Sequence, residues 1–430
     1  VGAGTTLAQI VAMVGEARRT RAPIQSVADK FAGWFVPAVV LVAIAAFIAW
    51  MLLGPEPRFA YAIVAAVSVL IIACPCAFGM ATPMSITVAA GRGARSGILI
   101  KDAAHLERLA EADTLIIDKT GTITKGKPEV TDIVAAEGVA QTGVLALAAS
   151  AEAGSTHPLA EAILRKAQEE GAKPARAERF ETRTGLGVLA VIGGRTLALG
   201  NAALMGELNV DTGPLEAEAA RLRGEGKTAV FLAAGDKLLG LLAIADPVKD
   251  NAAQALKELR AHGVKHIIMA TGDEEATAKA VARQGGIEEI AAAQTPADKA
   301  ALVRKLKGEG RIVAMAGDGV NDAPAMAEAD SAIAMATGSQ VAVESAGLTL
   351  LKGDLSKLVK ARTLAEATLK NVKQNLFFAV IYNGLGIPVA AGVLYPVLGV
   401  LLSPIIAAAA MSMSSVSVIS NALRLGRVKL

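Results

Sequence analysis

Residues 114–122 have the sequence Thr-Leu-Ile-Ile-Asp-Lys-Thr-Gly-Thr, a short apolar run that ends in a carboxylate, a lysine and two hydroxyl groups. Two later runs share this design. The run at 266–270 precedes Thr-Gly-Asp, and the run at 312–316 precedes Gly-Asp-Gly-Val-Asn-Asp. Short apolar runs bounded by glycine and polar residues are typical of buried strands. The sequence therefore predicts three strands that end in reactive side chains.

A parallel sheet is the arrangement that these runs favour. A fourth apolar run spans 331–335, and helical segments such as 251–261 and 296–307 alternate with the runs. Such alternation is typical of an α/β doubly wound sheet, in which ligands bind beyond the carboxyl ends of the strands. Residues 124–243 interrupt the pattern with helices and strand pairs of their own. We expect them to form an inserted α+β domain.

The strand ends supply the groups that phosphoryl transfer needs. One carboxylate can act as nucleophile, and a second can hold the Mg²⁺ ion that offsets the phosphate charge. Glycines let the backbone approach a phosphate closely, and a lysine neutralises charge that develops on it. Lys299, just after Thr-Pro-Ala-Asp at 295–298, is the candidate for that lysine.

Part of the chain is expected to lie in lipid. The 430 residues are 53% hydrophobic and 19% charged, whereas a soluble domain carries about 25% charged residues. Four stretches can span a bilayer, which takes about 20 helical residues: 34–53, 59–80, 376–394 and 397–423. The basic residues that flank these stretches lie in the cytosol by the positive-inside rule: Arg18, Arg19, Arg21, Lys30, Arg92, Arg95, Lys101, Arg424, Arg427 and Lys429.

These features predict an integral membrane protein with two helical hairpins and cytosolic catalytic domains. The alanine-rich composition favours a bacterial inner membrane. A net charge of +3 without a basic tract excludes nucleic acid as a partner.

The two cysteines, Cys74 and Cys76, are separated only by Pro75. A disulfide between them would close a minimal, strained loop, and their apolar surroundings exclude a secreted disulfide framework. Residues two apart on a regular helix point to nearly opposite sides. Because proline breaks or kinks a helix, both thiolates can face one point, and thiolates in an apolar setting favour soft ions such as copper(I).

In combination, the strand-end motifs resemble the P-type ATPases, and the resemblance covers essentially the whole chain. It implies that Asp118 becomes an aspartyl-phosphate, and that Mg²⁺ is held by Asp118, Asp318 and the Thr120 carbonyl. Around the phosphoryl group and the ATP phosphates it implies Thr271, Gly272, Asp273, Lys299, Asn321 and Asp322.

The inserted domain resembles that of the heavy-metal branch of this family. There, a His-Pro pair and a Gly-x-Gly bind the adenine end of ATP, although a His-Pro pair alone is usually only a turn. The nucleotide-binding residues so implied are Glu152, His157, Gly185, Gly187, Gly200 and Asn201. Thr156 departs from the branch, which usually has glutamate there, and we expect at most a modest effect on nucleotide affinity.

The membrane helices resemble those of the copper(I) exporters. The metal-contacting residues that this implies are Cys74, Cys76, Tyr382, Asn383, Met411 and Ser415. A zinc or cadmium pump is expected to place an aspartate in the last span, and residues 397–423 contain none. Silver(I) resembles copper(I) in charge and softness, so the sequence leaves it open. The resemblance also implies delivery of copper(I) by a cytosolic copper chaperone.

The predicted organisation begins part-way through such a pump. We expect residues 1–29 to be the end of the actuator domain and a linker, 30–103 and 369–430 the membrane hairpins, 104–123 and 244–368 the phosphorylation domain, and 124–243 the nucleotide-binding domain. No Thr-Gly-Glu loop is present, and Val14-Gly15-Glu16 is a coincidental near match. We therefore expect this chain alone to dephosphorylate poorly and not to complete a transport cycle.

Two other classes of function remain. A membrane-tethered phosphatase would explain the aspartates but not the residues of the membrane helices. A non-catalytic metal-binding membrane protein would leave the strand-end motifs without a role.

Overall fold

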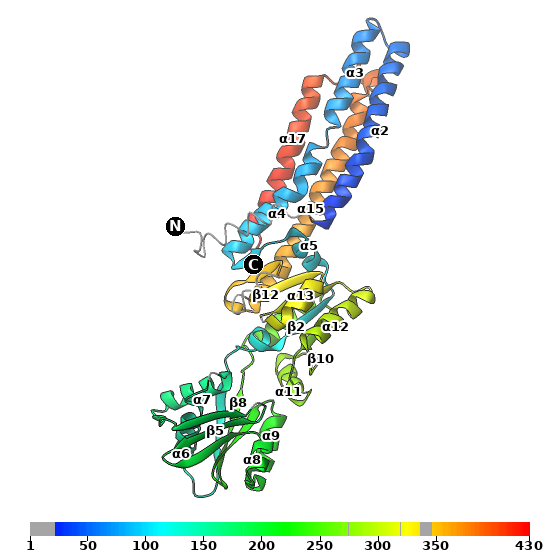
Figure 1. Cartoon of the computed structure of the whole chain (residues 1–430). Helices are drawn as coiled ribbons and strands as arrows, with labels where there is room; N and C mark the ends of the chain where they lie inside the picture. Colours follow the sequence, from blue (N-terminus) through cyan, green and yellow to red (C-terminus); the bar gives the residue numbers. More distant parts are fainter. Residues whose placement is uncertain (1–21, 156, 184, 274, 319, 336–345) are drawn as a thin grey trace.

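The computed structural model describes residues 22–430 except 156, 184, 274, 319 and 336–345. Figure 1 shows an elongated molecule, with a bundle of long helices at one end and two separate sheets below it. The near match at residues 14–16 and the predicted departure at Thr156 lie outside the described residues.

The sheet nearer the bundle has seven strands in the order β1-β13-β12-β11-β2-β9-β10. All neighbours are parallel except β1 and β13. The four strands predicted from apolar runs are confirmed, and three short ones were not predicted. The strands are β1 (Ile98–Ile100), β2 (Thr114–Asp118), β9 (His266–Ala270), β10 (Glu289–Ala291), β11 (Val313–Gly317), β12 (Ser331–Met335) and β13 (Leu348–Leu350).

Helices cover both faces of this sheet, as a doubly wound fold requires. Leu115 and Ile117 of β2 belong to the core beneath α5, α10 and α11. Ile116, which points to the other face, belongs to the core beneath α12 and α13. The helices are α5 (Ala103–Glu111), α10 (Ala252–Ala261), α11 (Glu275–Gly285), α12 (Pro296–Gly308) and α13 (Ala323–Glu328).

The second sheet lies farther from the bundle (Figure 1) and is antiparallel, in the order β3-β8-β7-β6-β5-β4. One of its faces packs on α6 and α7 and the other on α8 and α9. Its strands are β3 (Glu129–Ala135), β4 (Arg179–Arg183), β5 (Gly187–Ile192), β6 (Arg195–Gly200), β7 (Thr228–Ala234) and β8 (Lys237–Ala245). Its helices are α6 (Gln141–Glu152), α7 (Pro158–Glu169), α8 (Ala202–Glu207) and α9 (Gly213–Gly224).

The bundle consists of α2 (Pro23–Leu53), α3 (Arg58–Ile72), α4 (Cys76–Arg95), α15 (Ser356–Ala390), the short α16 (Tyr395–Leu398) and α17 (Pro404–Leu423). Three segments of the described chain are long and apolar enough to cross a membrane: 23–53, 58–95 and 404–427. The predicted span at 376–394 is not among them: α15 ends at Ala390, and the residues that precede Leu376 in this helix are the polar Lys373, Gln374 and Asn375. The predicted span at 397–423 is shorter than expected, because its helix begins only at Pro404.

A single helix, α15, runs from the seven-stranded sheet into the bundle over 35 residues. Figure 1 shows it (orange) passing from the edge of that sheet to a position among α2, α3, α4 and α17. The domain boundary predicted between residues 368 and 369 falls inside this helix.

Candidate active site and membrane metal site

Asp118 is the last residue of β2 and is buried, with 7% of its surface exposed. Lys299 reaches it from α12, with its Nζ 2.5 Å from Asp118 Oδ1 and 2.7 Å from Asp322 Oδ1. The capping box between Thr295 and Asp298 fixes the start of α12 just before Lys299. The lysine therefore lies between two carboxylates that come from different strand ends.

A third carboxylate completes the cluster. Oxygens of Asp118, Asp318 and Asp322 lie within 4.8 Å of one another. Burial and, after it, the charge of Asp322 together raise the pKa of Asp118 to about 7, although Lys299 opposes the shift. Burial likewise raises the pKa of Asp318 to about 6. Burial lowers the pKa of Lys299, yet Asp118 and Asp322 outweigh it and the net shift is upward, so the lysine stays charged.

This cluster fits a divalent cation. Three carboxylates share one buried lysine, so when ionised they leave about two negative charges unbalanced, and oxygen ligands of this kind suit Mg²⁺. The position of Asp318 also explains why residue 121 is a glycine. Its φ is +68°, and a Cβ there would lie 1.6 Å from Asp318 Oδ2. The loop after β2 can approach Asp318 only without a side chain at this position.

The other strand ends lie beside this cluster. Asp118 pairs with Ala270 in the sheet, which puts Thr271 next to the loop after β2. Thr271 is buried, and its Oγ1 accepts a hydrogen bond from the Asp273 amide at 3.1 Å. Residues exposed at the surface of the site are Thr120, Gly272 and Asn321. The structure thus brings the strand-end residues implied by the resemblance to one edge.

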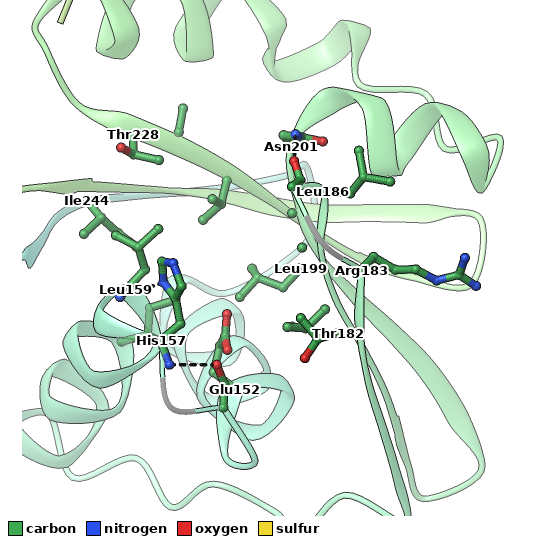
Figure 2. Close-up of a pocket in the computed structure, with 18 residues that line it drawn as sticks. Glu152, His157, Leu159, Thr182, Arg183, Leu186, Leu199, Asn201, Thr228 and Ile244 are labelled. Atoms are coloured by element: carbon green, nitrogen blue, oxygen red, sulfur yellow. Dashed lines mark hydrogen bonds between the residues drawn. The ribbon is translucent and has the colours of Figure 1, made fainter. Parts of the chain in front are cut away.

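A pocket of about 500 Å³ lies on the antiparallel sheet. All six residues implied for nucleotide binding line it: Glu152, His157, Gly185, Gly187, Gly200 and Asn201. Figure 2 shows Glu152 and His157 close together, across the pocket from Asn201. Asn201 Nδ2 donates to the Gly185 carbonyl at 2.9 Å and so ties that loop to the start of α8.

Two glycines let β5 and β6 approach closely at this pocket. A Cβ on Gly187 would lie 2.2 Å from the Leu199 carbonyl oxygen, and one on Gly200 would lie 2.3 Å from the Leu186 carbonyl oxygen. Glu152 lines the pocket. Its Oε2 is buried and has no hydrogen-bond partner among the described residues. Burial raises the pKa of Glu152. The pocket therefore offers a buried acceptor beside an imidazole.

In the bundle, the helix breaks where Pro75 predicts a break. α3 ends at Ile72 and α4 begins at Cys76. The structure differs from the expected thiolate pair, because Cys74 and Cys76 form a disulfide with Cα atoms 5.4 Å apart. The break lets both side chains turn to the same side, so the minimal loop that the sequence predicts to be strained is closed in the structure. The sulfurs converge on one point, and metal binding requires the reduced pair.

The other residues implied for the metal site lie on α15 and α17. Tyr382 Oη donates to the Ala410 carbonyl at 2.7 Å, which places the tyrosine against the turn before Met411. Asn383 is buried, and Met411 and Ser415 are partly buried. Among the described residues, no hydrogen bond joins the cysteines to this group. The structure brings Tyr382 and α17 together, but gives the cysteines no polar contact with them.

A polar network that sequence reasoning missed links three helices of the bundle. Ser85 of α4 donates to Asn371 Oδ1 at 2.8 Å, and Asn375 Nδ2 lies 3.2 Å from the Ser85 hydroxyl. Asn421 of α17 donates to Asn375 Oδ1 at 2.9 Å, and its carbonyl accepts from Asn371 at the same distance. The hydrogen bonds join helices that are far apart in the chain, so no local pattern in the sequence marks the network.

Comparison with known proteins identifies the family. Residues 112–330 match the family model of haloacid dehalogenase-like hydrolases. The whole chain is 58% identical to a copper-transporting P-type ATPase of Rhizobium leguminosarum bv. viciae, covering 51% of it, and 54% identical to a silver exporting P-type ATPase of Salmonella typhimurium, covering 52%. The crystal structure of a zinc-transporting PIB-type ATPase in the E2.Pi state matches 98% of this chain and 68% of that one, at 35% identity and a TM-score of 0.82. The chain belongs to the P-type ATPase family.

This P-type ATPase chain spans about half the length of the curated relatives it matches. The site around Asp118 also contains two lysines to which the sequence analysis gave no role. Lys119 Nζ lies 2.5 Å from Asp273 Oδ2, across two strand ends. Lys249 lies just after β8, and burial lowers its pKa to about 8. The signal for Lys249 was the charged segment 246–250, which directly follows an apolar strand.

Proposed function

We propose that the protein uses ATP to export copper(I) across a membrane, through an aspartyl-phosphate formed on Asp118. The observation that carries this proposal is the buried nucleophile itself. A carboxylate lies at a strand end, paired with a lysine and flanked by two further carboxylates. Relatives that match the full chain are named copper-transporting and silver exporting P-type ATPases.

The chemistry is an in-line displacement at the γ-phosphorus of ATP. A carboxylate oxygen of Asp118 forms a bond to phosphorus, and the bond to the β–γ bridging oxygen breaks, so that ADP leaves with that electron pair. Lys299 offsets the charge on the phosphoryl oxygens. Asp318 and Asp118, with the Thr120 carbonyl, would hold Mg²⁺, which supplies further charge neutralisation. Thr271, Asn321 and Asp322 position the group.

The pocket on the antiparallel sheet is proposed to take the adenine end of ATP. Its buried Glu152 oxygen can accept a hydrogen bond from the adenine amino group. His157 caps α7, with its Nδ1 accepting from the Leu159 amide at 3.2 Å. That bond holds the exposed ring at the pocket, where we propose that it stacks on the base. The Gly187 and Gly200 backbones let the base lie flat against β5 and β6.

Copper(I) is the metal that the membrane residues favour. Soft thiolate and thioether sulfurs select copper(I) over harder ions, and here they are Cys74, Cys76 and Met411. Tyr382, Asn383 and Ser415 are the proposed oxygen contacts. The solved relative is named for zinc, but helix α17 contains no aspartate. Silver(I) is the second candidate, because its softness is the same and one relative is named for it.

The setting follows from these proposals. We infer a bacterial inner membrane with both sheets in the cytosol, where a cytosolic copper chaperone delivers the ion.

A labelling experiment tests the proposal. The purified chain is incubated with γ-labelled ATP, Mg²⁺ and copper(I), and acid-stable, hydroxylamine-sensitive label is measured on the protein. We expect label that disappears in Asp118→Asn and loses its metal dependence in Cys74→Ser. Label that ignores the metal in the parent protein would instead favour a phosphatase, and complete lack of label would favour a non-catalytic metal-binding protein. Silver(I) in place of copper(I) separates the two metals.

A further inference from the structure

Lys249 has contacts that none of the roles above explains. Its Nζ donates to three backbone carbonyls: Gly121 at 2.6 Å, Thr122 at 2.7 Å and Gly353 at 2.7 Å. The first two belong to the loop that follows the nucleophile. The third lies three residues before the first residue of α15. A single ammonium group therefore joins the catalytic loop to the start of α15, the helix that runs from the sheet into the bundle.

A second contact joins the same two segments of the chain. Asn251 Nδ2 donates to Asp354 Oδ1 at 2.6 Å. Asp354 in turn accepts from the Ser356 amide and from the Ser356 hydroxyl, both at 2.8 Å, and so holds the first residue of α15. Residues 249 and 251 thus hold the start of α15 through two independent contacts, of which only the lysine touches the catalytic loop.

The segment that carries these residues is itself attached to the catalytic loop. The Lys249 amide donates to the Ile123 carbonyl at 2.9 Å, and Thr124 forms a β-bridge with Val248. A shift of the loop at 121–124 therefore moves residue 249 with it. Because a charged donor with three acceptors is costly to leave unpaired, the Gly353 carbonyl is expected to follow.

From Gly353, displacement can reach the metal site through one rigid element. α15 is continuous from Ser356 to Ala390, so Tyr382 lies about 39 Å along its axis from Ser356 at 1.5 Å per residue. Arg362 fixes the helix to the sheet domain about two turns from its start, where its guanidinium donates to the carbonyls of Ala112 and His262, each at 2.9 Å. We infer that α15 pivots at Arg362. Lys249 then acts on the short part of the helix that lies between its first residue and this pivot.

We propose that Lys249 is a positioning residue. It couples the conformation of the loop that follows Asp118 to the position of the first turn of α15, and the hydrogen bond from Asn251 to Asp354 supports the same contact. This inference rests on the proposed phosphoryl acceptor at Asp118. It adds a physical route by which a phosphoryl group in the cytosol biases the helix that carries Tyr382 and Asn383.

The test uses hydrogen exchange in the whole chain, in lipid nanodiscs with Mg²⁺. Beryllium fluoride binds a carboxylate in place of a phosphoryl group, so exchange is measured with and without it. In the parent protein we expect slower exchange both at residues 118–124 and at residues 354–362. The change at 354–362 should be about fivefold, the effect of one hydrogen bond on local opening.

The variants separate coupling from folding. Lys249→Met should keep the response at 118–124 and lose the response at 354–362, whereas Lys249→Arg, which can still donate to the carbonyls, should retain most of both. Asn251→Ala should weaken the response of α15 alone. Gln254→Ala is the matched control, because this exposed amide bonds only Glu258 of its own helix among the described residues.

Each outcome of this experiment either supports or refutes the coupling through Lys249. An undiminished α15 response in Lys249→Met overturns the proposal, as does a parent protein that responds at 118–124 but not at 354–362. If Lys249→Met also loses the loop response, Asn251→Ala decides, since that side chain does not touch the loop. A parent protein without any response at 118–124 refutes the Asp118 acceptor itself, and the coupling fails with it.

Discussion

The contact between Gly121 and Asp318 gives a sharp prediction for Gly121→Ala. A Cβ there would lie 1.6 Å from Asp318 Oδ2, so the carboxylate or the loop must move by about 2 Å to reach an ordinary contact distance. A misplacement of 1 Å in a reacting group can cost about 100-fold in rate. We therefore expect phosphoprotein formation from ATP to slow by at least about 100-fold, with a weaker dependence on Mg²⁺.

Gly138→Ala is the matched control for this prediction. Gly138 has a similar φ of +78°, but a Cβ there would have no atom within 4 Å. Both variants carry the backbone cost of a left-handed alanine, about 1–2 kcal/mol, so both should lose similar thermal stability. Only Gly121→Ala also disturbs the carboxylate cluster.

A rapid-quench assay with labelled ATP, at several Mg²⁺ concentrations, measures the two effects. Similar melting temperatures with very different rates would separate the local clash from general destabilisation. If Gly121→Ala forms phosphoprotein within about twofold of Gly138→Ala, the close approach of the loop to Asp318 is not needed for catalysis. The assignment of Asp318 to the Mg²⁺ site would then be wrong.

Three further predictions concern the same sites. Burial raises the pKa of Asp118 to about 7 and of Asp318 to about 6. Both groups hold protons in the folded state at pH values where they are ionised in the unfolded chain, so the metal-free fold loses stability as the pH rises from about 4 to about 7. Protons also compete with Mg²⁺, and the half-saturating Mg²⁺ concentration for labelling should fall at least about tenfold between about pH 5.5 and 7.5; a flat profile would contradict these shifts. Lys299→Met leaves the carboxylates without their cation and should reduce labelling about 100-fold, with partial recovery in Lys299→Arg; equal labelling in both variants would exclude a charge role. Gly187→Ala meets the Leu199 carbonyl at 2.2 Å and should raise the half-saturating ATP concentration at least about tenfold, whereas an unchanged titration would place the nucleotide elsewhere.

Sequence patterns predicted the parts of the fold where local signals are strong. The strands β2, β9, β11 and β12 each carry three or four consecutive apolar residues bounded by polar residues or glycine, so their positions were predicted to within about a residue. β1, β10 and β13 have three residues each, too few to show a period. The antiparallel pairing of β1 with β13 depends on contacts between residues about 250 apart in the chain, which no local pattern encodes.

The residues of the candidate site likewise fall into those that the sequence predicted and those that it did not. Residues at strand ends were predicted together because parallel strands end at one edge. The role of Lys249 was not predicted because its three acceptors are backbone carbonyls from distant segments. Since every residue has a backbone carbonyl, the sequence does not show which of them accept a hydrogen bond. The convergence of Cys74 and Cys76 at the helix break was predicted from Pro75. The disulfide between them was not, because its minimal loop was expected to be strained and both cysteines were expected to remain thiolates.

The amide network in the bundle determines how far a displacement of α15 can travel. Asn371 and Asn375 are buried with their partners in α4 and α17, and an unpaired buried amide costs about 1–3 kcal/mol. Bending α15 at this level would break several of these bonds at once, so the helix is expected to move as a rod together with α4 and α17. α4 begins at Cys76, and α17 carries Met411. A movement that starts at Gly353 therefore reaches the helices of the proposed metal contacts other than Cys74, which lies between α3 and α4, through one set of hydrogen bonds. Asn375→Leu removes the central amide and leaves the Asn421 side-chain amide without its acceptor. It should uncouple copper(I) from labelling while labelling itself persists, and labelling that still depends on copper(I) in this variant would refute the rigid-body argument.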